Sequence, residues 1–198
     1  MIRHRLGLVV NPIAGMGGRL GLKGTDGEEV LRICREKGAI AEAPKKAVEA
    51  LLRLAPLKSE IEIVTYPGEM GEIEAKDAGF NPTVIGKITP GETTSEDTRR
   101  AAKEIADYGV DILLFAGGDG TARDIYSAVK DRRQVVLGIP AGVKIHSGVF
   151  AINPRRAGEL ALLYLQGKVK DVREAEVMDI DEEAFRQGWV STALYGYL

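Results

Sequence analysis

The chain has 198 residues and a formal net charge of −2, with 27 basic side chains distributed among 29 acidic ones. This balance offers no basic face to nucleic acid and no polybasic patch to a membrane, so we expect a small-molecule ligand and neither of those partners. The single cysteine, Cys34, excludes an intramolecular disulfide framework and fits a reducing cytoplasm. The apolar run near the N-terminus is too short for a signal peptide or a membrane span, so we expect a mature, soluble start.

Along the chain, segments with the apolar spacing of a strand alternate with segments that have the apolar spacing of a helix. The run 111–116 is apolar without alternation, which is typical of a strand covered on both faces of a parallel sheet. We expect strands at 6–10, 61–65, 83–85, 111–116 and 134–139, and helices at 28–37, 47–54, 69–78, 101–106 with Thr94 or Ser95 as its N-cap, 122–129 and 154–166. This order predicts an α/β fold, an open and mostly parallel Rossmann-like sheet with helices on both faces.

The stretch Phe115–Asp124 carries the strongest functional pattern. Three glycines follow the apolar run directly, at Gly117, Gly118 and Gly120. Glycines tolerate positive φ and let backbone N–H groups approach a ligand, and Thr121 can cap the helix expected from Ala122. Because a helix N-terminus with bare amides binds anions, we interpret this stretch as a phosphate-binding active-site loop.

Asp119 lies among these glycines, where a loop that only held phosphate would gain nothing from a carboxylate. An aspartate can accept a hydrogen bond from a sugar hydroxyl and orient that hydroxyl for attack on phosphorus. Asp119 therefore predicts that a phosphate donor and a hydroxyl acceptor share one crevice. The alternative is a plain Gly-Asp-Gly turn, because Asp-Gly pairs are common in turns.

A second glycine-rich loop follows the first strand. It is not the dinucleotide-binding fingerprint, because Leu20 occupies the third small position, and it is not a Walker loop, because neither Gly-Lys pair of the chain precedes Ser or Thr. A plain connecting loop is the alternative. Its candidate phosphate ligands are Asn11, Gly15, Gly17, Arg19 and Lys23.

A third loop, Pro140–Gly148, follows the strand at 134–139. Ligands of open parallel sheets bind beyond the carboxyl ends of the strands, so the three loops can converge there. Positive charge suits phosphoryl transfer, whereas a lone histidine is more often structural. The candidates in this loop are Gly142, Lys144, His146 and Ser147.

After residue 170 the sequence no longer alternates between strand and helix patterns. Patterns at 172–180 and 189–197 predict two strands, joined by a turn or short helix at 181–186. A hairpin alone is only marginally stable. We therefore expect an α/β nucleotide-binding domain at 1–170, and at 171–198 the start of a β-sandwich domain whose remainder is absent.

Three motifs are associated with strand ends: Asn11-Pro12 after the first strand, Gly117-Gly-Asp-Gly-Thr121 after a later one, and Gly138-Ile-Pro-Ala-Gly142 after the next. Together they resemble the NAD kinase and diacylglycerol kinase superfamily, most closely its ATP-NAD kinase-like proteins, over nearly the whole chain. The resemblance implies an N-terminal α/β domain followed by a β-sandwich domain, with the nucleotide at their junction.

The resemblance also implies a reaction: a phosphoryl group passes from ATP or polyphosphate, with Mg²⁺, to the 2′-hydroxyl of the adenosine ribose of NAD, giving NADP. Homo-oligomers are implied as well. Asp119 would bind and activate the acceptor hydroxyl, and Gly117, Gly118, Gly120 and Thr121 would form the phosphate loop. We expect Arg123 and Lys144 to balance the phosphate charge.

Two other functions stay open. A kinase of another hydroxyl, on a lipid or a sugar nucleotide, would need an apolar groove or a membrane patch. A non-catalytic regulator that binds NAD or ATP is favoured by the loop 144–147, which does not reproduce the usual NAD kinase pattern. A Rossmann dehydrogenase is disfavoured by Leu20 and Asp119.

Overall fold

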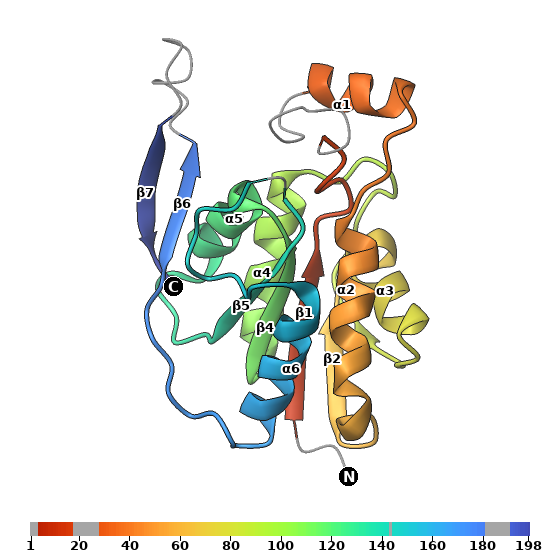
Figure 1. The fold of residues 1–198 in the computed structure, drawn as a ribbon. Helices are drawn as coiled ribbons and strands as arrows, with labels where there is room; N and C mark the ends of the chain where they lie inside the picture. Colours follow the sequence, from red (N-terminus) through yellow and green to blue (C-terminus); the bar gives the residue numbers. More distant parts are fainter. Residues whose placement is uncertain (1–3, 18–27, 143, 181–190) are drawn as a thin grey trace.

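The computed structural model describes residues 4–17, 28–142, 144–180 and 191–198 (Figure 1). Within them, five strands form one sheet in the order β3-β2-β1-β4-β5. Each adjacent pair is parallel, which confirms the open parallel sheet predicted from the sequence. The strands are β1 (His4–Val10), β2 (Ile61–Thr65), β3 (Thr83–Val84), β4 (Ile112–Gly117) and β5 (Val136–Pro140).

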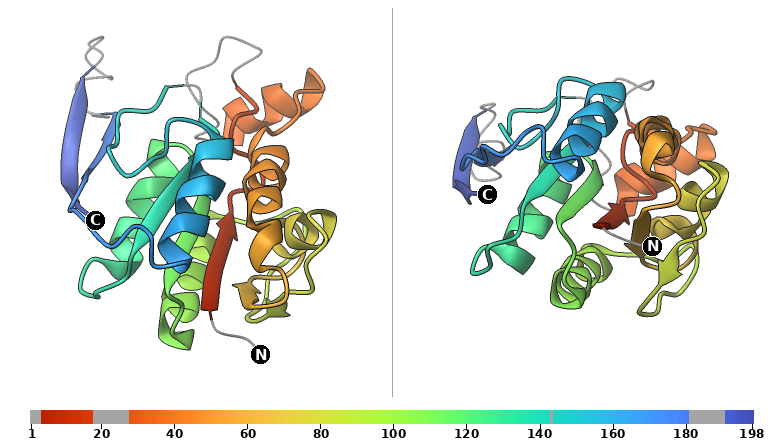
Figure 2. Two further views of the ribbon diagram at one scale, coloured as in Figure 1. Left: turned by 60° about the horizontal axis from the view of Figure 1, so that its bottom comes forward. Right: turned by 90° about the horizontal axis from the view of Figure 1, so that it is seen from below.

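Helices cover both faces of this sheet (Figure 2). Strand β4 shows how: Leu114 packs into the core under α2 and α6, and Phe115 into the core under α4 and α5. Both side chains are fully buried, and burial of a side chain of this size contributes about 1.5–3 kcal/mol. None of the described helices is long and apolar enough to cross a membrane. The helices are α1 (Glu28–Glu36), α2 (Ala43–Leu51), α3 (Glu72–Asp77), α4 (Ser95–Tyr108), α5 (Asp119–Val129) and α6 (Pro154–Leu165), with 3₁₀ turns η2 (Leu52–Leu57) and η3 (Gly68–Met70).

The starts of α4 and α5 test the capping predictions. Thr94 is the N-cap of α4 and forms a capping box with Asp97, as one of the two predicted options. In contrast, α5 starts at Asp119 with Gly118 as its N-cap, so the prediction that Thr121 caps a helix from residue 122 was wrong. The carboxylate at the first helical position favours this earlier start, because it lies at the positive end of the helix dipole.

After α6, two strands form an antiparallel hairpin: β6 (Glu176–Ile180) and β7 (Thr192–Tyr197). Residues 172–175, predicted as part of the first strand, precede it, and the turn predicted at 181–186 lies outside the described residues. The hairpin stands beside α5 in Figure 1 and packs on it, with Val177 fully buried. A Cβ at Gly196 would lie 2.3 Å from the ring of Tyr126, so the backbone of β7 rests directly on α5.

Glu74 of α3 provides a test of the fold. It is buried, and its Oε2 has no hydrogen-bond partner among the described residues. Desolvation raises its pKa from 4.5 to about 7, and the charges of Asp77 and Glu69 act in the same direction. The protonated Glu74 carboxyl stabilises the folded state fully below pH 4.5, and this stabilisation is lost as the pH rises through 7. The reason is that the same carboxyl ionises at a lower pH in the unfolded chain.

We expect Glu74→Gln to leave the free energy of unfolding unchanged near pH 4 and to raise it by about 1–3 kcal/mol at pH 8. Urea unfolding at both pH values measures the difference. Glu92→Gln, at an exposed position, is the matched control and should show no gain at either pH. A Glu74→Gln gain that is the same at pH 4 and pH 8 would contradict the assignment.

Candidate functional site

Three loops meet at the carboxyl edge of the sheet, as the topology of parallel strands requires. The backbone N–H of Asn11 donates to the carbonyl oxygen of Ala116 at 3.0 Å. The backbone N–H of Ala141 donates to the carbonyl oxygen of Gly117 at 2.8 Å. A Cβ on Gly142 would lie only 2.9 Å from the Cα of Gly118. The loops after β4 and β5 are therefore in backbone contact, which a side chain at Gly142 would force apart.

The loop after β1 joins this contact. Gly15 has a φ of +87°, and a Cβ there would lie 2.5 Å from the carbonyl oxygen of Ala141. The side-chain amide of Asn11 makes two hydrogen bonds. Its Nδ2 donates to Thr121 Oγ1 at 3.0 Å, and its Oδ1 accepts from the backbone N–H of Ile13 at 3.2 Å. Asn11 thus links the first loop to α5. Gly17 ends the described part of this loop, and the candidates Arg19 and Lys23 lie outside it.

The first turn of α5 supplies the amides that the sequence predicts for phosphate. Asp119, Gly120 and Thr121 occupy the first helical positions, where N–H groups have no acceptor inside the helix. A Cβ at Gly117 would lie 2.3 Å from Thr121 Oγ1, so the chain folds back tightly as strand becomes helix. This places the bare amides at the junction of the three loops, which is the geometry of an anion site.

The Asp119 carboxylate is buried, 7% exposed, and both of its oxygens are engaged. Oδ2 accepts from the backbone N–H of His146 at 2.8 Å and lies 3.1 Å from the Nδ1 of the same residue. Oδ1 accepts from the backbone N–H of Ser147 at 3.0 Å and from its hydroxyl at 2.7 Å. The third loop therefore closes directly onto the carboxylate through two consecutive residues.

Ser147 extends this contact to the hairpin. Its Oγ accepts from the backbone N–H of Met178 in β6 at 2.9 Å and also lies 2.9 Å from the Met178 carbonyl oxygen. A hydroxyl has one proton, so it can donate either to Asp119 or to this carbonyl, but not to both at once. The sequence contained no signal for this link, because Met178 takes part only through its backbone.

The two predicted phosphate cations have different surroundings. Lys144 is exposed in the third loop and forms no ion pair with another described residue. Arg123 lies 3.0 Å from Asp179 of β6 and stacks near the ring of Tyr195 of β7. Desolvation lowers the pKa of Arg123, but the hydrogen bond to Tyr195 and the charge of Asp179 outweigh it, and the pKa is raised. Arg123 thus fastens the hairpin to α5.

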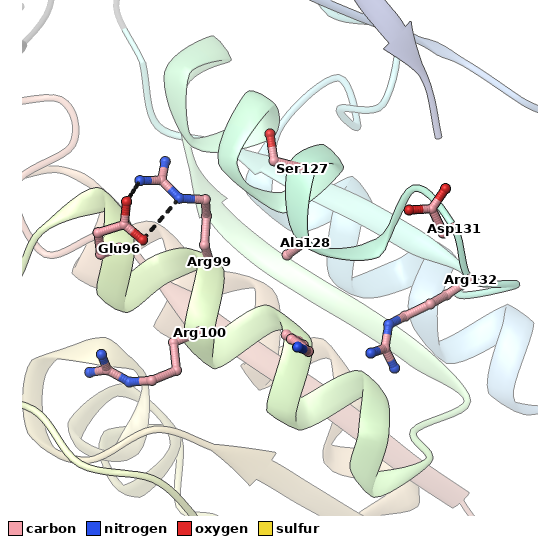
Figure 3. A pocket seen from close by; sticks show the side chains of 8 residues that line it. Glu96, Arg99, Arg100, Ser127, Ala128, Asp131 and Arg132 are labelled. Atoms are coloured by element: carbon pink, nitrogen blue, oxygen red, sulfur yellow. Dashed lines mark hydrogen bonds and ion pairs between the residues drawn. The ribbon is translucent and has the colours of Figure 1, made fainter.

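A surface groove lies between α4 and α5 (Figure 3), and no residue of the three glycine loops lines it. It is lined by Glu96, Arg99, Arg100, Lys103, Ser127, Ala128, Asp131 and Arg132. Its three arginines pair with carboxylates: Arg99 with Glu96 and Asp124, Arg100 with Asp97, and Arg132 with Asp107. Because these charges are already compensated and no glycine loop reaches the groove, we do not place a phosphate ligand there.

A family model for the ATP-NAD kinase N-terminal domain matches residues 6–169 of the chain. A search of curated protein sequences returned no match. Among solved structures, a proposed diacylglycerol kinase from Bacillus anthracis str. Sterne aligns at 16% identity and a TM-score of 0.43, covering 90% of this chain and 46% of that one. A proposed UDP-N-acetylglucosamine 2-epimerase from Listeria monocytogenes aligns at 15% identity and a TM-score of 0.38, covering 70% and 32%.

The chain thus spans about half the length of the Bacillus anthracis structure. At these identities and TM-scores, the structural likenesses carry no argument about chemistry. The family model is the match that supports such an argument, because residues 6–169 include most of β1, all of β2 to β5 and the three glycine loops.

Ser147→Ala tests the link between the third loop, Asp119 and the hairpin. The change removes a buried hydroxyl and leaves the Met178 N–H without its acceptor, so we expect a loss of about 1–3 kcal/mol in the free energy of unfolding. Urea unfolding measures this loss, and hydrogen exchange should speed up at Met178. Ser127→Ala is the control, because that hydroxyl bonds only within its own helix, to the carbonyl of Arg123. Equal effects of the two variants would refute the link.

Proposed function

The chain belongs to the ATP-NAD kinase N-terminal domain family, and from this premise we propose that it transfers a phosphoryl group from ATP to the 2′-hydroxyl of the adenosine ribose of NAD. The observation that carries the proposal is the meeting of three glycine loops and the first turn of α5 around Asp119. Backbone amides without side chains in front of them suit a triphosphate, and the adjacent carboxylate suits a hydroxyl acceptor.

The phosphate donor is proposed to lie against the amides at Gly118–Thr121, with Gly15, Gly17 and Gly142 permitting close approach. Among the described cations, Lys144 is proposed to add positive charge, because it is exposed in the loop that contacts Asp119. Arg123 would have to leave Asp179 to reach a phosphate. Inorganic polyphosphate presents the same oxygen chemistry as ATP, so it is the alternative donor.

Mg²⁺ is proposed to enter with the nucleotide, as MgATP. The described residues contain no group of three or more His, Cys, Asp or Glu side chains that could hold a metal. Mg²⁺ usually keeps several waters and binds through substrate phosphates with only one or two carboxylates, so a dedicated protein cage is not required. The same family membership is the basis on which we propose a cytoplasmic homo-oligomer.

A second candidate function is nucleotide binding without transfer. The surroundings of Asp119 favour it, because residues 146 and 147 already contact both oxygens of the carboxylate that would otherwise meet the acceptor hydroxyl. A regulator of this kind would bind ATP or NAD and form no product. The two candidates therefore differ in one measurable outcome.

The test is incubation of the full chain with MgATP and NAD, with NADP read out by a dehydrogenase that accepts only NADP. We expect NADP to form and Asp119→Asn to lower turnover by about 10²-fold or more. Asp131→Asn, in the remote groove, is the matched control and should keep full turnover. If NAD binds by calorimetry but no NADP appears, the binding candidate replaces the kinase. Near-normal turnover of Asp119→Asn would remove Asp119 from the reaction.

A further inference from the structure

We propose that Ser147 is a positioning residue that couples the acceptor site at Asp119 to the β6–β7 hairpin. Its hydroxyl donates to Asp119 in the ligand-free chain and turns to the carbonyl oxygen of Met178 when the acceptor hydroxyl binds to Asp119. The inference rests on the proposed phosphotransferase function and adds a conformational link to that site. It starts from the three polar groups that surround one hydroxyl.

The Ser147 hydroxyl is buried and lies within hydrogen-bond distance of both α5 and β6. Its Oγ is 2.7 Å from Oδ1 of Asp119, and 2.9 Å from both the backbone nitrogen and the carbonyl oxygen of Met178. A hydroxyl carries one proton and can also accept hydrogen bonds. The N–H of Met178 can therefore donate to Oγ in every state, while the proton of Ser147 goes to one of two oxygens.

Both oxygens stay within reach of Ser147 because other contacts hold β6 in place. The neighbour of Met178 in β6, Asp179, lies 3.0 Å from Arg123 of α5. The backbone N–H of Gly148, the residue after Ser147, donates to the carbonyl oxygen of Glu176 at 2.8 Å. The third loop is thus fixed between α5 and the edge of β6. The Ser147 proton can change its acceptor by rotation of the hydroxyl alone.

The ligand-free chain favours donation to Asp119. A carboxylate is a stronger acceptor than a carbonyl, and the distance to Asp119 is the shorter of the two. To orient an acceptor hydroxyl, the carboxylate must offer it a lone pair. Ser147 can release one because the Met178 carbonyl oxygen then receives its proton. A buried hydroxyl without this second acceptor would be left unpaired, which is costly.

The exchange of acceptors has a consequence for the hairpin. Before the acceptor binds, Ser147 makes one hydrogen bond to Met178, through the N–H; afterwards it makes two. Binding of the acceptor hydroxyl therefore tightens the contact between the third loop and β6. Because coupling between two sites is reciprocal, the hairpin in its observed position favours acceptor binding by the same factor.

Hydrogen exchange at the Met178 N–H, followed by NMR in the full chain, tests the coupling. Saturating NAD, with binding checked by calorimetry, should slow this exchange by about 2- to 10-fold, as expected for one added neutral hydrogen bond. The matched ligand is 2′-deoxy-NAD, which lacks the acceptor hydroxyl on the adenosine ribose and should slow the exchange by less than about twofold.

Two variants show whether Ser147 carries the effect. Ser147→Ala should abolish the effect of NAD on the Met178 N–H. Ser127→Ala should retain it, because that hydroxyl bonds only to the carbonyl of Arg123 in its own helix. The proposal is overturned if bound NAD does not slow the exchange, if 2′-deoxy-NAD slows it equally, or if Ser147→Ala responds to NAD as the unsubstituted chain does.

Urea unfolding without ligand tests the second acceptor of Ser147. In Asp119→Ala the hydroxyl keeps only the Met178 carbonyl oxygen, so adding Ser147→Ala should raise the equilibrium constant for unfolding by about 2- to 10-fold. If that oxygen does not receive the proton, the hydroxyl is unpaired in Asp119→Ala, and its removal is neutral or stabilising. That outcome would also overturn the proposal.

The two measurements separate this inference from the proposed function. If calorimetry shows no binding of NAD, the proposed acceptor is wrong, and the unfolding of the Asp119→Ala pair still decides whether the Ser147 hydroxyl has a second acceptor. If Asp119→Ala does not fold, the exchange measurement decides the proposal, because it uses chains in which Asp119 is intact.

Discussion

The buried carboxylate of Asp119 is the constraint on which the described site depends. Burying a charge without partners is very costly, and among the described residues the partners come from two, His146 and Ser147. To provide them, the chain after β5 must fold back across the N-terminus of α5. The Ser147 hydroxyl also accepts a hydrogen bond from the backbone N–H of Met178 in β6. The ion pair between Arg123 and Asp179 holds the same hairpin on α5. The Asp119 carboxylate therefore connects the start of α5 with the loop after β5 and, through Ser147, with the hairpin.

The parallel sheet and its glycine loops could be predicted from sequence because their signals are local. The unbroken apolar run of β4 requires cover on both faces, and the glycines after it mark the point where the backbone approaches another loop. The start of α5 was misplaced because glycine usually weakens a helix, whereas here Gly120 lies inside its first turn. The role of Arg123 was not predictable either, since Asp179 is distant in sequence and joins it only once the hairpin packs on α5.

The same reasoning explains why His146 was difficult to interpret from sequence alone. A histidine two residues beyond Lys144 could face solvent, fill a core position or approach a ligand, and no local pattern separates these cases. Its position depends on a contact with Asp119, which lies far away in sequence, at the start of α5. Convergence of the loops was predictable from the topology, but the direction of one ring within them depends on side-chain packing. A site is therefore easier to locate from sequence than to assign by role.

The glycine loops by themselves cannot distinguish one phosphate-containing ligand from another. Backbone amides recognise phosphate oxygens, and these oxygens are the same in ATP, in polyphosphate and in other nucleotides. Gly118 and Gly142 meet backbone to backbone, so neither can discriminate between acceptors with a side chain. Discrimination requires hydrogen-bonding groups that are left unpaired when the wrong acceptor binds. Around Asp119 the third loop contains two such groups, the side chains of His146 and Lys144. Under the proposed function, this loop would therefore select the acceptor, while the glycines would hold the phosphates of the donor.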